Sequence, residues 1–226
     1  MELRDAFELR KDRFRLLDKG LVTAHFEKTD PLLEAGCASG GGVGHLMSLG
    51  YTELTAFDID ATAIDRAREK FPDVKLFCAD ARELPFDDGA FKGIVSEAAF
   101  SVISGKEKAA KEYARVLKKG GRVLMDDFAI LSGAEIPRNQ GIPCLDGVQT
   151  MDRYRAVFTS AGFKMIYQKE EFGEYIGIAM SLGRSYGVKA ASVGKFIVSE
   201  FGRDGYVTDF FAHTRLTYCQ MIFEKV

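Results

Sequence analysis

Two aspartates and a glycine-rich turn are the residues with the clearest chemical potential. The turn spans residues 36–44 and follows a short apolar run. Asp58 ends a second apolar run, 18 residues after Gly40, and Asp80 ends a third. Glycine lets a ligand approach the backbone because it has no Cβ. A carboxylate at Asp58 can accept both hydroxyls of a ribose, and one at Asp80 can accept from the exocyclic amine of a purine. Together these features predict a nucleoside site.

Glu34, just before the turn, indicates which end group the nucleoside carries. A dinucleotide site uses G-x-G-x-x-G, in which a helix N-terminus faces a pyrophosphate. Here the segment reads Glu34-x-Gly36-x-Ala38-x-Gly40, and the overlapping glycines at 40–44 lack the final spacing of the dinucleotide motif. The carboxylate of Glu34 would repel a pyrophosphate and attract a cationic end, such as the ammonium of a methionyl group.

Regularly alternating strands and helices are expected to position these residues. Short apolar runs predict strands at 32–33, 54–57, 74–79, 91–96 and 122–125. Helices are predicted at 42–49, 60–70 and 106–117, with Asp60 as a plausible N-cap. Because parallel strands need crossover helices, this pattern predicts an α/β fold with a doubly wound sheet. The carboxyl edge of such a sheet is the expected binding crevice.

The rest of the chain adds elements at both ends of this core. A helix is predicted at 2–19, a loop at 131–149, a helix at 150–161, and strands at 163–172 and 215–225. Residues 173–214 are expected to be a late insertion between the last two strands. No linker separates a second unit, so we predict one domain over 1–226. Its expected parts are an N-terminal helical lid (1–29), a cofactor-binding core (30–130) and substrate-side elements (131–226).

Composition narrows the class of protein. The chain has 226 residues, 46% hydrophobic and 28% charged, with a net charge of -2. These values are ordinary for a folded protein, and the charge gives no general attraction to nucleic acid or an anionic membrane. The charged N-terminus and the lack of an apolar run near ~20 residues argue against a signal peptide and a membrane span. A cytoplasmic protein with neither nucleic-acid nor membrane partners is expected. The wide spacing of four cysteines and three histidines predicts no metal site.

The segment from Leu32 to Asp127 resembles the class I S-adenosylmethionine-dependent methyltransferases, in particular those acting on small molecules. Residues 34–40 look like the first motif of that family, with Ala38 in place of the usual middle glycine. The ribose-binding, adenine-binding and strand-five segments of the family are matched by 56–60, 78–86 and 117–124. The resemblance covers about 100 residues. It implies a seven-stranded, mostly parallel, Rossmann-like sheet with an antiparallel last strand.

The resemblance also implies a role for each cofactor residue. Glu34, Gly36 and Gly40 would face the methionine part of S-adenosyl-L-methionine, with Cys37 and Ala38 between them in the turn. The ribose would be held by Asp58 and Ile59, and the adenine by Asp80 and Ala81. Ser96 would border the methionine end through its backbone.

No catalytic residue is fixed by the sequence. Glu97 directly follows the fourth strand, where it would either orient or deprotonate a substrate or be an ordinary solvated acid. Cys37 is interpreted as a small packed residue rather than a nucleophile.

The sequence therefore predicts methyl transfer from S-adenosylmethionine to a small-molecule acceptor. A non-catalytic sensor or assembly domain that binds S-adenosylmethionine is an alternative, because the same residues would serve it. A nicotinamide-dependent oxidoreductase is a third hypothesis. The acceptor atom and the oligomeric state cannot be read from these residues.

Overall fold

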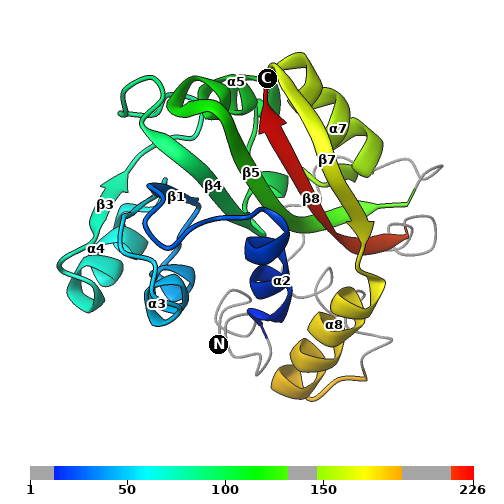
Figure 1. Ribbon diagram of the computed structural model, residues 1–226. Coiled ribbons are helices and arrows are strands. Elements are labelled where there is room, and N and C mark those ends of the chain that lie inside the picture. Colours follow the sequence, from blue (N-terminus) through cyan, green and yellow to red (C-terminus); the bar gives the residue numbers. More distant parts are fainter. Residues whose placement is uncertain (1–12, 132–146, 190–214) are drawn as a thin grey trace.

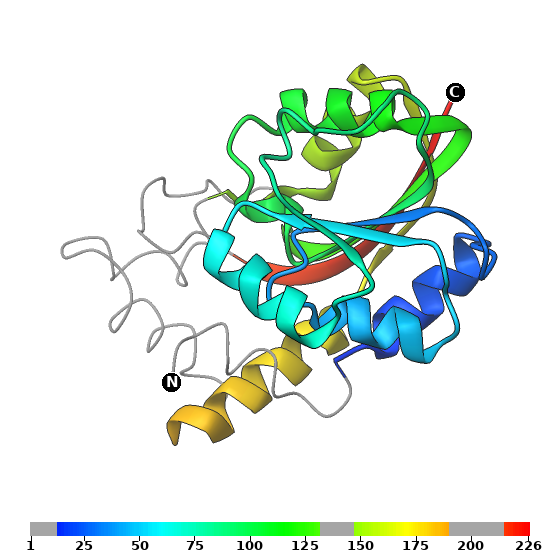
Figure 2. The same ribbon diagram turned by 90° about the vertical axis from the view of Figure 1, so that its left-hand side faces the viewer.

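One sheet with helices on both faces forms the centre of the computed structural model (Figures 1 and 2), which describes residues 13–131, 147–189 and 215–226. Its strands are β1 (Leu32–Ala35), β2 (Leu54–Asp58), β3 (Lys75–Cys78), β4 (Phe91–Glu97), β5 (Leu117–Ile130), β6 (Gln149–Thr150), β7 (Phe163–Glu170) and β8 (Leu216–Lys225). The order across the sheet is β3-β2-β1-β4-β5-β8-β7, with β6 paired to β5 off this path. Only the pairs made by β8, with β5 and β7, are antiparallel among these strands.

This topology confirms the predicted α/β class and the doubly wound, mostly parallel sheet. The seven strands of the main path include the antiparallel last strand that the resemblance implied. The two-residue β6 is an addition that the sequence did not predict. It pairs with the far end of β5 at Ala129 and Ile130.

The helices cover the two faces unequally. They are α2 (Arg15–Thr23), α3 (Gly41–Ser48), α4 (Ala61–Lys70), α5 (Lys106–Val116), α7 (Met151–Ser160) and α8 (Phe172–Tyr186), with a 3-10 turn, η1, at Phe100–Val102. Figure 2 shows α5 and α7 on one face of the sheet, with α2, α3, α4 and α8 on the other.

Local signals explain where two of these helices begin. Asp60 precedes α4, and its Oδ1 accepts from the backbone N–H groups of Thr62 and Ala63. Thr150 plays the same part for α7 by accepting from the N–H of Arg153. Such N-caps satisfy backbone donors that have no partner inside the helix. The predicted N-cap at Asp60 is thereby confirmed.

Two cores hold the helices to the sheet. Under α5 and α7, large aromatic side chains are fully buried, and Phe158 stacks on Phe223 with 4.1 Å between ring centroids. On the other face, Leu17 and Leu21 of α2 belong to a cluster with sheet residues such as Leu124. Gly20 permits this close contact, because a Cβ there would lie 2.5 Å from Leu124 Cδ1. The described part of the expected lid therefore packs on the sheet.

Several element boundaries differ from the prediction. The predicted fifth strand at 122–125 is extended at both ends in β5, because Leu117 pairs with Phe91 of β4 at one end and β8 pairs with β5 as far as Ile130 at the other. Helix α2 runs to Thr23 instead of ending near residue 19, and residues 2–12 of the predicted helix lie outside the described residues. The expected insertion at 173–214 is described only as far as 189, and it contains most of α8.

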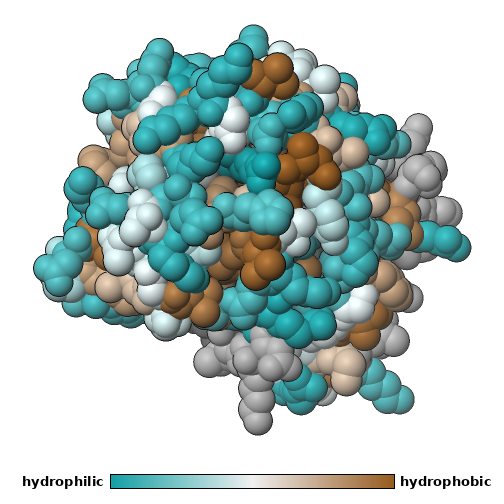
Figure 3. Space-filling view, viewed as in Figure 1, coloured by the Kyte–Doolittle hydropathy of each residue, from teal (hydrophilic) through white to brown (hydrophobic). Residues whose placement is uncertain are grey.

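The surface is mainly polar on the face shown in Figure 3, with apolar side chains scattered among hydrophilic ones. No helix in the described ranges is long and apolar enough to cross a bilayer.

Candidate functional site

The turn between β1 and α3 alternates between ordinary and left-handed backbone conformations. Gly36, Ala38 and Gly40 have φ angles of +74°, +52° and +83°. The N–H groups of Gly36 and Cys37 both donate to the carbonyl of Phe57 on β2, over 2.9 and 3.0 Å. Ala38 thus adopts a conformation that costs an L-residue roughly 1–2 kcal/mol. The turn has the shape for which glycine is suited, even at the position where alanine replaces it.

Asp58, the last residue of β2, is bound to this turn. Its Oδ2 accepts from the N–H of Ala38 at 2.8 Å, and its Oδ1 accepts from the N–H of Asp60 at 2.9 Å. The carboxylate is partly buried, whereas the next side chain, Ile59, is 69% exposed. The predicted ribose acid therefore lies directly beside the turn, with an apolar side chain available to a ligand next to it.

Asp80 lies beyond the end of β3 and is held by an arginine that the sequence analysis did not single out. Arg82 donates to its carboxylate from Nε at 3.0 Å and from Nη2 at 2.6 Å, and from its backbone N–H at 2.8 Å. These hydrogen bonds lower the pKa of Asp80. An adenine amine at Asp80 would share the carboxylate with Arg82. The neighbouring Ala81 is buried.

Glu34 is the most perturbed acid at the turn. Its side chain is only 7% exposed, and its Oε2 has no hydrogen-bond partner in the part of the chain that the structure describes. Burial raises the pKa of Glu34 to about 8, with a further increase from Glu97 and an opposing effect from Arg13. A buried acceptor without a donor is costly. A cationic donor at this position would relieve that cost.

The end of β4 brings Ser96 and Glu97 to the same edge. Ser96 is buried, and Glu97 is partly buried. The following residue, Ala98, has a φ of +49°, and its N–H donates to the carbonyl of Asp126 at 2.7 Å. A Cβ on Gly36 would approach the Cβ of Ala99 to 2.5 Å, so the β4 loop lies against the turn after β1.

Residues before α2 add a positive charge that sequence reasoning missed. A Cβ on Gly41 would lie 2.9 Å from Nη1 of Arg13, which places that guanidinium against the start of α3. Arg13 also lies over the ring of Phe14, which stacks on His45 at 4.1 Å. The Nε2 atom of His45 is 2.6 Å from Oδ1 of Asp18. This stack of side chains joins α2 to α3 beside the turn.

The structure therefore brings most of the predicted cofactor residues to one edge. Glu34, Asp58 and Ser96 lie at strand ends around the turn that contains Gly36, Cys37, Ala38 and Gly40. Cys37 is buried, with its Sγ 3.7 Å from the carbonyl oxygen of Ala38. Asp80 and Ala81 follow the neighbouring strand β3. The arrangement offers acceptors for hydroxyl and amino groups around a closely approachable backbone.

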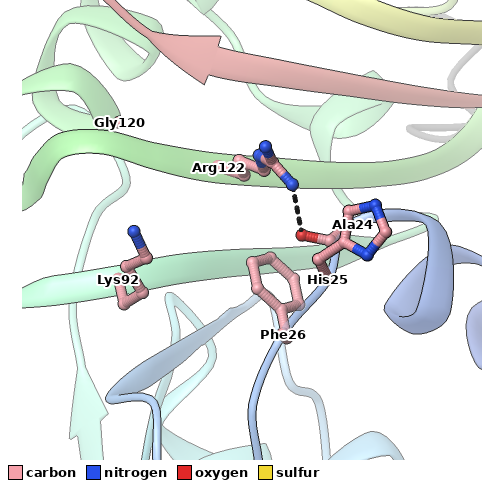
Figure 4. A pocket seen from close by; sticks show the side chains of 6 residues that line it. All are labelled: Ala24, His25, Phe26, Lys92, Gly120 and Arg122. Carbon is pink, nitrogen blue, oxygen red and sulfur yellow. Dashed lines mark hydrogen bonds between the residues drawn. The ribbon is translucent and has the colours of Figure 1, made fainter.

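A separate hollow lies at the opposite edge of the sheet. Its lining residues are Ala24, His25, Phe26, Lys92, Gly120 and Arg122 (Figure 4). Arg122 donates to the carbonyl of Ala24 at 2.9 Å and to Glu224 from Nε and Nη2. The guanidinium of Arg122 is therefore already hydrogen-bonded to groups of the protein. None of the predicted site residues lines this hollow.

Comparison with known proteins shows which proteins this chain resembles. A family model described as a methyltransferase domain matches residues 33–125. The ubiquinone/menaquinone biosynthesis C-methyltransferase UbiE of Idiomarina loihiensis is 37% identical over 83 residues, which are 34% of this chain and 33% of that protein. The 27-O-demethylrifamycin SV methyltransferase of Amycolatopsis mediterranei is 26% identical over 163 residues, covering 66% and 60%. The chain thus spans between a third and three fifths of the length of these two curated relatives.

Solved structures share the fold over most of the chain. A geranyl diphosphate methyltransferase in complex with S-adenosylmethionine aligns with a TM-score of 0.76 at 11% identity, over 95% of this chain and 86% of that one. The 4+2 cyclase SpnF aligns with a TM-score of 0.74 at 17% identity, over 94% and 80%. At these identities the likeness establishes the fold alone.

Proposed function

We infer, from the membership of this chain in the class I S-adenosylmethionine-dependent methyltransferases, that it transfers a methyl group from S-adenosylmethionine to a small-molecule acceptor. The observation that carries the inference is the turn after β1, hydrogen-bonded to Asp58, with a buried and unsatisfied Glu34 oxygen beside it. A sulfonium nucleoside has complementary groups for each of these features, whereas a pyrophosphate would face Glu34.

The residues of the turn and of two strand ends are proposed to hold the cofactor. Glu34 would receive the ammonium of the methionine part, over the backbone of Gly36, Cys37, Ala38 and Gly40 and beside Ser96. Asp58 and Ile59 would hold the ribose, and Asp80 and Ala81 the adenine. Arg13, against the start of α3, is added here as a charge partner for the carboxylate of the methionine part.

Methyl transfer makes modest chemical demands on the protein. The sulfonium when bound supplies an electrophilic methyl carbon. The protein must place the acceptor in line with the carbon–sulfur bond and exclude water, which is an effect of proximity and orientation. Glu97 at the end of β4 is the nearest candidate among the predicted residues to orient the acceptor or take its proton.

The acceptor is proposed to be a small molecule. The two curated relatives described above carry names that refer to a C-methylation in quinone biosynthesis and to a demethylrifamycin. We also propose that the protein is cytoplasmic and that residues 1–226 form one domain.

Calorimetric titration with S-adenosylmethionine, S-adenosylhomocysteine and NADH tests the cofactor. We expect binding of the first two and none of NADH. Release of S-adenosylhomocysteine during incubation with a panel of small acceptors then tests the activity. Binding without turnover on any acceptor would favour the non-catalytic alternative, and binding of NADH alone would contradict the proposal.

A further inference from the structure

The loop that follows β4, residues 98–105, lies between the turn after β1 and the start of α5. Its first residues contact that turn, since a Cβ on Gly36 would approach the Cβ of Ala99 to 2.5 Å. Ala98 has a φ of +49°, which costs an L-residue roughly 1–2 kcal/mol. A strained residue of this kind persists only where the surrounding structure holds it. The contacts that hold this loop therefore determine how it meets the turn.

An aromatic side chain anchors the middle of the loop. Phe100, in η1, is fully buried under α5 and α7, with its ring centroid 4.8 Å from that of Phe158 and 5.9 Å from that of Tyr113. Apolar burial is not directional, so this contact keeps η1 in the core without fixing the orientation of its backbone. Hydrogen bonds are directional and can fix it.

Two buried charged side chains hold the next residue, Ser101, from opposite sides. Asp127 of β5 is fully buried, and its Oδ2 accepts from the N–H of Ser101 at 2.8 Å, while its Oδ1 accepts from the N–H of Phe128 at 2.7 Å. Lys106 is buried at the start of α5, and its Nζ donates to the carbonyls of Ser101 at 2.7 Å and Ile103 at 2.8 Å. The backbone of Ser101 is thus held at its N–H by an acid and at its carbonyl by a base.

The residue before Asp127 holds the same loop in a different way. The carbonyl of Asp126 accepts from the N–H of Ala98 at 2.7 Å. The side chain of Asp126 lies on the face that α2 covers, because its Oδ1 accepts from Nε2 of Gln220, which also donates to the carbonyl of Leu16 on α2. Consecutive residues of β5 therefore fix the loop at two points, Asp126 through its backbone and Asp127 through its side chain.

Burial of Asp127 and Lys106 is costly. It raises the pKa of Asp127 to about 6, against the hydrogen bonds that the carboxylate accepts, and lowers the pKa of Lys106 to about 8, against the attraction of Asp127 and Glu107. Both groups are mainly charged near pH 7. Buried charged groups are a poor source of stability, because well-packed apolar side chains often serve as well. What these two side chains add to the apolar anchor is a fixed position for the backbone of Ser101.

We propose that Lys106 and Asp127 are positioning residues, which hold the loop after β4 against the turn so that Ala99 and Gly36 enclose the methionine part of the cofactor. This inference rests on the proposed function, which assigns the methionine part to that turn. Both residues act through the backbone of Ser101 and not by contact with the cofactor. Loss of either should loosen the methionine end of the site, while the nucleoside end keeps its own acids on β2 and after β3.

The test compares S-adenosylhomocysteine with adenosine, which lacks the methionine part, by calorimetric titration of the full chain. Lys106→Met removes both hydrogen bonds and keeps the apolar stem of the side chain. We expect the affinity for S-adenosylhomocysteine to fall about fivefold to tenfold, and that for adenosine to change less than about twofold. Arg122→Met is the matched control. It removes another partly buried cation that donates to a backbone carbonyl, that of Ala24 at the opposite edge, and should leave both affinities unchanged.

Asp127→Asn is a second variant of nearly the same shape, in which one acceptor oxygen remains for two N–H groups. It should lower the affinity for S-adenosylhomocysteine relative to adenosine by a smaller factor, and it decides the question if Lys106→Met does not fold. Equal losses for the two ligands, or unchanged affinities in the folded variants, would overturn the inference, because the two residues would then contribute to stability alone. If S-adenosylhomocysteine did not bind to the original protein, the proposed function would fail instead, so the two failures are distinguishable.

Discussion

The backbone N–H of Ala38 donates to Oδ2 of Asp58 over 2.8 Å, so the turn after β1 and the end of β2 are joined through one carboxylate. The same side chain accepts from the N–H of Asp60 with its other oxygen. Asp58 therefore fixes the shape of the turn and also presents oxygen lone pairs at the proposed ribose position.

Replacing Asp58 separates these two effects. Asp58→Ala should weaken S-adenosylmethionine binding by about 1–3 kcal/mol, roughly fivefold to 150-fold, because ribose hydroxyls lose their acceptor and the turn loses its hydrogen bond. Asp58→Asn keeps one acceptor oxygen, so its affinity for S-adenosylmethionine should lie between that of the original protein and that of Asp58→Ala. Calorimetry provides the affinities. An alanine variant that binds as tightly as the original protein would argue against the ribose assignment.

Ala38 offers a test of backbone strain. Ala38→Gly removes the Cβ from a residue with a φ of +52°, and should raise the free energy of unfolding by about 0.5–1 kcal/mol after the greater flexibility of unfolded glycine is deducted. Thermal unfolding should show an increase in Tm of about 1–4 °C. A lower Tm would mean that the alanine methyl group contributes packing that outweighs the strain.

Glu34 should couple cofactor binding to proton release. The pKa of about 8 in the free protein leaves this acid mostly protonated at pH 7, instead of ionised as a carboxyl with the ordinary value of 4.5 would be. An ammonium partner favours the ionised form, so binding should release a proton, and Kd should fall as the pH rises toward 8 and then level off. Titrations in buffers of different ionisation enthalpy measure the protons released. Glu34→Gln should abolish this proton release. Proton release that persists in the variant would mean that another titratable group is responsible.

Gly42 should not tolerate a side chain. A Cβ at this position in α3 would overlap Oε1 of the buried Glu34. We expect Gly42→Ala to lower the free energy of unfolding by about 1–3 kcal/mol. Gly177→Ala in α8 is the matched control: apart from its own helical turn, no atom of the described residues lies within 4 Å of the added Cβ, and alanine favours the helix by up to ~1 kcal/mol. Chemical denaturation distinguishes the two, and equal effects would contradict the close contact at Gly42.

Arg13 is expected to recognise the carboxylate of the cofactor. Arg13→Ala should weaken S-adenosylmethionine binding by about 1–2 kcal/mol. Decarboxylated S-adenosylmethionine lacks the group in question, so its affinity should change much less. Parallel titration of both compounds gives the difference. Equal losses for the two would show that Arg13 acts through the packing of Phe14 on His45.

Local signals allowed part of this structure to be predicted. The strand at 54–57 and the helix from Asp60 agree with β2 and α4 to within one residue, because an apolar run and an N-cap are properties of neighbouring residues. The length of β5 was missed because its two ends depend on pairing with other strands: Leu117 pairs with Phe91 of β4, and Ile130 pairs with Leu216 of β8. β6 has only two residues, so no periodicity could indicate it.

The residues of the candidate site likewise include some that the sequence predicted and some that it did not. Glu34, Gly36, Gly40 and Asp58 belong to adjoining strand ends, and their spacing was sufficient to place them together. The sequence did not predict the position of Arg13 beside the turn or the contact between Asp126 and Gln220. Asp126 and Gln220 are 94 residues apart in sequence, and nothing near either residue indicates that they meet. Contacts of this kind depend on the order of strands across the whole sheet.

The position of β8 has a consequence for how the chain acquires its structure. On one side β5 pairs with β4, to which it is joined by a short crossover. On the other side it pairs with β8, which lies about ninety residues later in the chain. Closing so long a loop slows folding, because chain entropy is lost before native contacts compensate for it. Until then one edge of β5 exposes unpaired backbone groups beside apolar side chains, which makes the partly folded chain vulnerable to aggregation.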